Sequence, residues 1–396
     1  MSTATLRSQC ARMLALWGVL AITLCLASVA SAQQNLIYIN SNITADKQNS
    51  VIALINDGFG NLTPVSGSPF LTGGTGVGAN PNSQVDYQWD SDGELAINKY
   101  GKLLFAVNGH SDDIAAFNID STGALTPVAG SPFPSGGKQP ASIAYLDDVL
   151  GNHVSMMVVA NKDSDPLDST GNPSYNSFKV TSHGVLSQYS SLALAAGVSP
   201  AQVLIEPKTT NFFGMEFQAS RIASYKLNQV GQMTPLSSVA TSGVVVGSVL
   251  HPTVKALYAT IPSAHSVGVF TWDSTAALYH IRDVADSGMA VCWSAVNAAG
   301  TRLYVSETIS STLSVFDLTN TKNPVQLQHL AVKGTGALPT HMRLDPTGKF
   351  LYVLDRTGVL QVFDVASDGT IAENHSPYNL GLPANTVPLG VAVLMK

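Results

Sequence analysis

Two stretches near the front of the chain, GNLTPVSGSPF (residues 60–70) and GALTPVAGSPF (residues 123–133), are almost the same phrase. They differ at two of eleven positions and begin 63 residues apart. Internal repetition at a fixed period is typical of one small structural unit that is stacked many times. We therefore expect less similar copies of the same unit along the rest of the chain.

Seven short apolar phrases that end in a polar or turn-forming residue mark these copies. They are LIYIN (36–40), LFAVN (104–108), MVVAN (157–161), FFGME (212–216), LYATI (257–261), LYVSE (303–307) and LYVLD (351–355). Each is followed by a second run with period-2 alternation, such as VLQVFDV (359–365), and then by a third that opens at a turn glycine. One further strand precedes most of them, often introduced by a proline, as in PASIAYL (140–146). Alternation rich in β-branched and aromatic residues indicates strands.

Four antiparallel strands in each of seven units predict an all-β fold, a seven-bladed β-propeller over residues 33–396. The repeat opens with a second strand at LIYIN and finishes with PLGVAVLMK (388–396), which has the shape of a first strand. We therefore expect the C-terminal strand to complete the first blade and close the ring. A β-sandwich could use similar strands, but it explains neither the sevenfold count nor the complementary ends.

Residues 1–32 differ from everything after them. Arg7 and Arg12 precede an apolar run at residues 14–29, and Ala30-Ser31-Ala32 follows it. This order of charged, apolar and small residues predicts a secretory signal peptide cleaved after Ala32, and hence a secreted or periplasmic protein. A transmembrane anchor is the alternative, but the run is short, is interrupted by Gly18 and is followed by no basic cluster. After cleavage, no membrane span is expected.

Composition excludes several classes of protein. The chain of 396 residues is 45% hydrophobic and 12% charged, which is enough apolar material for a large core. Its net charge is −6, and removing the two signal-peptide arginines gives 18 − 26 = −8, so nucleic acid is not an expected partner. The histidines lack metal-ligand spacing, and GGTGVG (73–78) lacks the lysine of a phosphate loop. We predict no cofactor and no metal site.

The stretch PTHMRLDPTGKFLYVLDRTGVLQVF (339–363) carries a family resemblance. Its P-x-H, D-P-x-G-K and L-Y-V elements resemble the seven-bladed lactonase family, which includes 6-phosphogluconolactonase-type enzymes and muconate cyclase-like proteins. The resemblance implies the propeller architecture and the hydrolysis of a lactone. The sequence departs from the enzymatic members at Thr340, where they carry an arginine before the histidine. Their Asn-Glu pair is matched loosely, by Glu307-Thr308 or by Asp355-Arg356.

Aligning the units places two rings of residues at one mouth of the central channel. The starts of the innermost strands supply Glu94, Ser142, Gln202, Gly247, Trp293, His341 and Gly390. The ends of the second strands supply Asn40, Asn108, Asn161, Glu216, Ile261, Glu307 and Asp355. Polar groups that converge on a mouth predict a ligand site. The alternative for the second ring is structural, because Asn and Asp at such positions often cap turns.

Opening a lactone requires a general base, donors for the oxyanion and groups that hold the substrate. We predict Glu94 or His341 as the catalytic base. Trp293 would stack on a sugar ring and Arg356 would hold an anionic group; Gln202, Glu307 and Asp355 are further candidate substrate contacts. The predicted function is an exported lactonase-like hydrolase of a small sugar-derived or organic-acid lactone. The alternative is a non-catalytic propeller that binds a ligand, such as a carbohydrate, or a protein partner.

Overall fold

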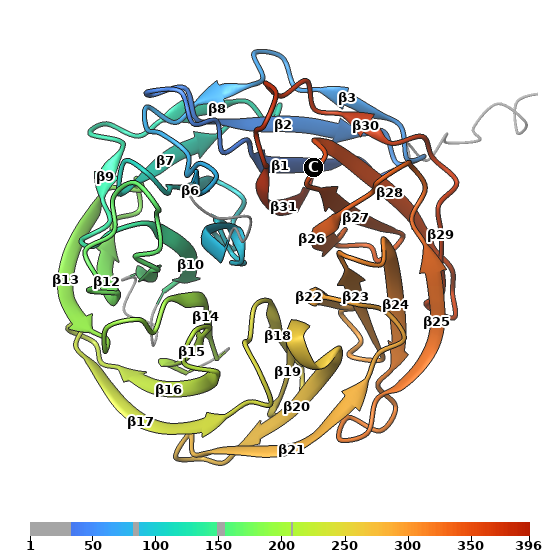
Figure 1. Ribbon diagram of the computed structural model, residues 1–396. Coiled ribbons are helices and arrows are strands. Elements are labelled where there is room, and N and C mark those ends of the chain that lie inside the picture. Colours follow the sequence, from blue (N-terminus) through green and yellow to red (C-terminus); the bar gives the residue numbers. More distant parts are fainter. Residues whose placement is uncertain (1–32, 82–86, 149–154, 207–208) are drawn as a thin grey trace, which may run out of the picture. The chain divides into compact units, whose positions relative to one another are not determined.

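The computed structural model describes residues 33–81, 87–148, 155–206 and 209–396, so the expected signal peptide lies outside the described residues. Residues 34–396 form one compact unit. Its strands make seven antiparallel sheets arranged as a ring (Figure 1). Four sheets have four described strands, and three have five because their outer strand is in two pieces. The prediction of a seven-bladed β-propeller is confirmed.

Each blade runs from an innermost strand near the axis to an outer strand at the rim. The innermost strands are β31 (Leu389–Met395), β5 (Leu95–Ile97), β10 (Pro140–Leu146), β14 (Pro200–Ile205), β18 (Ser248–Leu250), β22 (Val291–Val296) and β26 (Pro339–Leu344). The second strands are β1 (Asn35–Asn40), β6 (Leu103–Asn108), β11 (Ser155–Asn161), β15 (Asn211–Glu216), β19 (Ala256–Ile261), β23 (Arg302–Glu307) and β27 (Phe350–Asp355). The third strands are β2 (Ser50–Asn56), β7 (Asp113–Ile119), β12 (Ser174–Val180), β16 (Arg221–Leu227), β20 (Ser266–Trp272), β24 (Thr312–Asp317) and β28 (Val359–Val365).

The outer strands are of two kinds. Four are continuous: β13 (Leu186–Ala193), β17 (Met233–Ala240), β21 (Leu278–Ala285) and β25 (Val325–Ala331). Three are split into pairs of short segments: β3 (Leu62–Pro64) and β4 (Phe70–Leu71), β8 (Leu125–Pro127) and β9 (Phe133–Pro134), β29 (Ile371–Ala372) and β30 (Tyr378–Asn379). The first two split strands are the repeated phrase itself.

The division of these outer strands into two segments explains why the same sequence occurs in both blades. In the first copy, the backbone N–H of Val65 donates to the carbonyl of Ala53, and the hydroxyl of Ser68 then accepts from the N–H of Ala53, at 2.9 Å each. In the second copy, Val128 and Ser131 make the same two bonds with Ala116. The serine hydroxyl takes the place of a strand carbonyl as hydrogen-bond acceptor where the outer strand leaves the sheet. The same residues are therefore needed in both blades. The sequence pattern predicts an outer strand here, and the structure confirms it, with the strand divided into two short segments.

The C-terminal strand closes the ring. β31 pairs antiparallel with β1, with Val393 opposite Ile37 and Ala392 opposite Tyr38. The first blade therefore contains strands from both ends of the repeat, as predicted. Because β31 pairs with the inner edge of β1, that edge is not free to pair with a strand of another molecule.

The core lies between the blades. In β1, Leu36 and Tyr38 pack against the blade of β6, whereas Ile37 and Ile39 pack against the blade of β27. Side chains alternate between the two faces of a strand, and both faces of every blade are covered by neighbours, so strands such as β1 are buried along their whole length. Seven such interfaces, each burying apolar side chains, hold the ring together.

One segment does not follow the repeat. The 3₁₀ helix η1 (Tyr87–Trp89) lies inside the ring, where it is drawn in cyan in Figure 1. Residues 90–93 follow it and lead into β5; we call residues 87–92 the axial segment. A second 3₁₀ helix, η3 (Pro262–Ala264), connects β19 to β20. In the part of the chain that the structure describes, no helix has the length and apolar character needed to cross a membrane.

Candidate axial site

A β-bulge recurs where the innermost strands begin. In β14, Pro200 lies opposite Glu216 and Gln202 lies opposite Met215, so one extra residue is inserted. The same irregularity occurs at the start of β10, β22, β26 and β31. A bulge bends a strand and redirects the side chain that follows it. The repeated bulge therefore gives Ser142, Gln202, Trp293 and His341 of the first predicted ring a common geometry.

The alignment of the first ring holds in six blades and is wrong in one. Trp293 lies opposite Ser306, the residue before the end of β23, and the other members occupy equivalent places. In the closing blade the residue opposite Ile39 is Val391, and Gly390 is the bulged residue before it. Leu389 lies opposite Asn40 as Pro140 lies opposite Asn161, so Leu389 is the structural equivalent of Pro140, and counting from Pro388 places the ring position one residue too early.

The axial segment is bound by side chains from several blades. The indole Nε1 of Trp293 donates to the backbone carbonyl of Ser91 at 2.7 Å, and His341 Nε2 lies 2.9 Å from the same oxygen. From the opposite side of the ring, Lys162 Nζ donates to the carbonyl of Asp90 at 3.0 Å. Trp293 and His341 also contact each other, with ring centroids 4.8 Å apart. These groups hold the segment across the axis.

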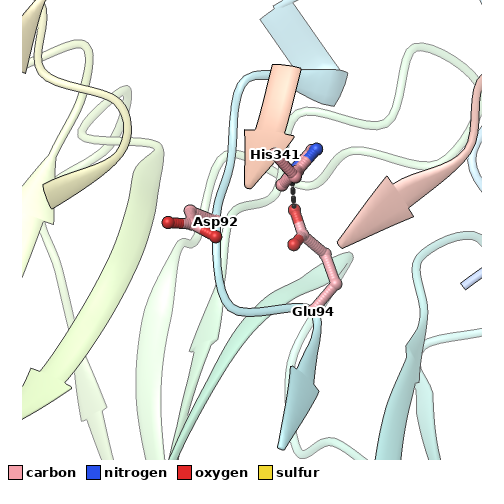
Figure 2. Close-up of side chains that lie close together, drawn as sticks. All are labelled: Asp92, Glu94 and His341. Carbon is pink, nitrogen blue, oxygen red and sulfur yellow. Dashed lines mark hydrogen bonds and ion pairs between the residues drawn. The ribbon is translucent and has the colours of Figure 1, made fainter. Parts of the chain in front are cut away.

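Glu94 is buried at the centre of this cluster (Figure 2), where its carboxylate points at the ring of His341. Its Oε1 accepts from the hydroxyl of Ser91 at 2.7 Å and lies 3.1 Å from His341 Nε2. Burial opposes ionisation, but the charge and hydrogen bond of His341, together with the bond from Ser91, outweigh it and lower the pKa of Glu94. The carboxylate is therefore ionised at neutral pH.

The other oxygen of Glu94 is free. Within the described residues, Glu94 Oε2 has no hydrogen-bond partner, although it is buried. Gly390 provides the space beside it, because a Cβ at that position would lie 2.9 Å from Oε2. Glu94 also lines a cavity of about 10 Å³ together with Ser91, Gln139 and Leu389. A cavity of this size holds about one water molecule.

Paired charges surround Glu94. Asp92 accepts from Arg343 Nη2 at 2.9 Å and from Gln202 Nε2 at 3.0 Å, so Gln202 reaches the cluster through Asp92. Asp90 accepts from Arg356 Nη2 at 2.8 Å. Burial lowers the pKa of Lys162 to about 8, against the opposing charges of Asp90 and Glu94. Three acids thus face three bases and a histidine. The shifted pKa values of Glu94 and Lys162 within one cluster are typical of functional sites.

Arg356 connects the buried cluster to the surface. Its guanidinium carbon lies 5.9 Å from the ring of Trp89 and 5.6 Å from the ring of Trp293. Both distances suit cation–π interactions. The side chain is 21% exposed, whereas Glu94, Trp293 and His341 are completely buried. Arg356 is therefore the part of the predicted site that solvent reaches.

Among the described residues, Asp92, Glu94 and His341 have donor atoms close enough to hold a metal ion, all within 4.8 Å of one another. Asp92 lies to one side of the pair in Figure 2. Its oxygens are already bonded to Arg343 and Gln202, and the adjacent guanidinium repels a cation. The donor set is therefore better satisfied as a hydrogen-bonded ion-pair network than as a metal centre.

The second ring does not join this cluster. Asp355 caps its own turn, because its two oxygens accept from the backbone N–H groups of Thr357 and Leu338, at 2.8 Å each. Glu307 is buried in its own blade, where Oε2 lies 3.0 Å from His329 Nε2. The structure thus brings together Glu94, Trp293, His341, Gln202 and Arg356, and leaves Glu307 and Asp355 apart from them.

Sequence reasoning missed Ser91, Asp92, Lys162 and Arg343. Two signals were present: the polar run DSDGE (90–94) immediately before an innermost strand, and a lysine directly after the ring residue Asn161. Burial raises the pKa of the Cys292 thiol to about 12, which makes it a poor nucleophile.

Comparison with known proteins agrees with the propeller fold. Residues 253–380 match the family described as "Lactonase, 7-bladed beta-propeller", which confirms the resemblance to that family. Among curated proteins, none matches the sequence significantly.

Several solved structures share the fold. One, from Bacteroides fragilis, is assigned as a candidate 6-phosphogluconolactonase; it is 16% identical, with a TM-score of 0.69 over 93% of this chain and 99% of that chain. A periplasmic gluconolactonase from Pseudomonas aeruginosa is 15% identical, with a TM-score of 0.71 over 91% and 99%. A protein from Lactobacillus plantarum is 16% identical, with a TM-score of 0.71 over the same shares. At these identities the similarity establishes the fold.

Proposed function

We propose that this lactonase-family propeller hydrolyses a small sugar-derived or organic-acid lactone, with Glu94 as the general base. The observation that carries the proposal is the carboxylate of Glu94, which is held by one oxygen and free at the other. Ser91 and His341 fix Oε1, Oε2 has no hydrogen-bond partner among the described residues, and Glu94 lines a cavity that holds about one water molecule. A general base needs this combination of fixed orientation and a free lone pair.

The chemistry follows from this arrangement. Glu94 Oε2 accepts a proton from the water while the water oxygen bonds to the lactone carbonyl carbon. The ring C–O bond then breaks, and the proton on Glu94 passes to the departing oxygen, which gives a hydroxy acid. Arg343 and Arg356 are both partly exposed and supply positive charge for the developing oxyanion.

The proposal has a structural requirement. A cavity of about 10 Å³ holds water but no lactone, and the axial segment covers the cluster. Substrate must therefore displace part of residues 87–92 before it reaches Glu94. The contacts that such a movement breaks are the bonds of Ser91 and Asp90 to the surrounding blades.

A second candidate function is supported by a different observation. Glu94, Trp293 and His341 are completely buried and bonded to one another or to the axial segment. Such a network also suits a non-catalytic scaffold, in which it would make the ring rigid and leave the faces free to bind a ligand or a protein partner.

Hydrolysis of a panel of lactones by the purified protein separates the two functions. We expect turnover of at least one lactone and a loss of about 10²-fold or more in kcat on Glu94→Gln, which keeps the shape but removes the base. Glu206→Gln is the matched control, because Glu206 is also buried and follows β14 at the far end of an innermost strand. No turnover of any lactone, or equal rates for both variants, would favour the scaffold.

We also propose that the protein is exported and acts on a small molecule outside the cytoplasm, on the evidence of the signal-peptide pattern in residues 1–32. The test is mass spectrometry of protein from its native host, with an expected N-terminus at Gln33. Retention of residues 1–32 would indicate a membrane anchor instead.

A further inference from the structure

A second, larger pocket lies beside the axial cluster. Its volume is about 310 Å³, within the range of small-molecule sites. One wall is the turn between β27 and β28, with Arg356, Thr357 and Gly358. The other wall is the connection from β30 to β31, with Asn379 and residues 382–387. The pocket thus lies where the last blade meets the closing strand.

The residues that line this pocket favour a ligand with a negative charge and hydroxyl groups. Arg356 is its one ionisable residue, so the fixed charge of the lining is positive. The exposed side chains of Thr357, Asn379 and Asn385 add a hydroxyl and two amides. The Arg356 side chain is 21% exposed, so part of its guanidinium is accessible from the pocket. A partly exposed guanidinium next to amide and hydroxyl groups suits an anion that also carries hydroxyls.

We propose that this pocket binds a small hydroxylated carboxylic acid, with its carboxylate at Arg356 and its hydroxyls at Asn379, Asn385 and Thr357. This inference rests on the proposed function and names the chemical class of the molecule at its site. Hydrolysis of a sugar lactone gives an acid of this class, so the pocket is placed to hold the product or a substrate that already carries a carboxylate.

Binding here is coupled to the axial segment through one competition. Asp90 and the ligand carboxylate both use the guanidinium of Arg356, and both side chains of the pair are about one-fifth exposed. A ligand that takes Arg356 weakens its hold on Asp90, and with it the attachment of the axial segment. Linkage requires the reverse as well, so weakening the Asp90 contact must strengthen ligand binding.

Calorimetric titration with D-gluconate tests the proposal without any need for turnover. We expect measurable binding of gluconate and none of sorbitol, which has the hydroxyls but no carboxylate. Arg356→Gln should weaken gluconate binding about 10-fold or more, the usual effect of losing a charge-assisted hydrogen bond. Arg356→Lys, which keeps the charge but loses the planar fork, should weaken it less. Asp90→Asn should tighten binding several-fold.

The matched control is Arg282→Gln, which removes one exposed arginine from β21, away from the pocket. Equal affinities of the parent and the Arg356→Gln variant, or tighter binding of sorbitol than of gluconate, would overturn the proposal. Weaker binding in Asp90→Asn would overturn the coupling. If gluconate binding fails while Glu94-dependent hydrolysis succeeds, this inference alone is wrong; if binding succeeds and no lactone is hydrolysed, the proposed catalysis is wrong.

Discussion

The two rings of residues at the channel mouth come from the same repeat and lie on the same face, yet their side chains bond to different parts of the molecule. Asn108, Asn161 and Asp355 end second strands and bond to the repeating blades and their connections. Asn108 bonds to Asp113 of its own blade and to Asn49 and Thr72 of the first blade, Asn161 bonds to Asn176, and Asp355 accepts from the N–H groups of Thr357 and Leu338. Trp293 and His341 begin innermost strands and bond to Ser91 of the non-repeating axial segment. Second-ring positions, which bond to the repeating blades, have similar residue types from blade to blade. First-ring positions, which face the axis, have different residue types.

Truncating a first-ring residue is expected to have the largest effect on stability. Trp293→Ala removes a completely buried indole and leaves the carbonyl of Ser91 with one partner fewer, so it should cost about 3–5 kcal/mol of unfolding free energy. Trp293→Phe, which keeps most of the packing, should cost about 1–3 kcal/mol. Urea unfolding followed by circular dichroism measures both. Unchanged stability with weakened lactone binding would instead make Trp293 a ligand platform.

A second-ring substitution should cost less and leave activity intact. Asp355→Asn replaces one carboxylate oxygen by an NH₂ group, which donates and does not accept. The side chain can then no longer accept from Thr357 with one oxygen and from Leu338 with the other. We expect a loss of about 1–2 kcal/mol in the same unfolding assay. The parental rate of lactone hydrolysis should persist; a fall in kcat at unchanged stability would move Asp355 into the site.

A pH-dependent effect tests the surroundings of Glu307, the second-ring residue that bonds to His329 of its own blade. Burial, together with the neighbouring Glu307 carboxylate, raises the pKa of Asp286 to about 7. An aspartate in the unfolded chain titrates near 3.9, so between these values the folded state holds more protons. This contribution is complete below about pH 4 and is lost as the pH rises through about 7.

The unfolding free energy should therefore fall by about 1–3 kcal/mol between pH 5 and pH 8. Asp286→Asn should flatten that slope, whereas Asp46→Asn, at an exposed residue, should leave it unchanged. Urea titrations at a series of pH values provide the measurement. Equal slopes in the parent and in Asp286→Asn would show that this carboxyl does not carry the proton.

The repeat explains which features could be predicted. Blade strands such as β27 were predictable because both of their faces are buried, which makes the apolar letters uniform from copy to copy. Glu94, Trp293 and His341 could be aligned because each lies ten residues before a recognisable second-strand phrase. The axial segment has no counterpart in the other blades, so no alignment could reveal that Ser91 and Asp92 complete the cluster. The split of β3 from β4 depends on the Ser68 hydroxyl, and nothing in the strand pattern indicates it.

The pairing of β1 with β31 has a consequence for folding on the ribosome. Residues 35–40 emerge early in synthesis, whereas their inner partner at residues 389–395 is made after every other blade. Until then β1 presents an open edge, and the apolar side chains of Ile37 and Ile39 have no neighbouring blade to cover them. Cotranslational folding can therefore assemble the intermediate blades in order, but the first blade must wait for the last strand, and in that interval the nascent chain most needs protection by chaperones.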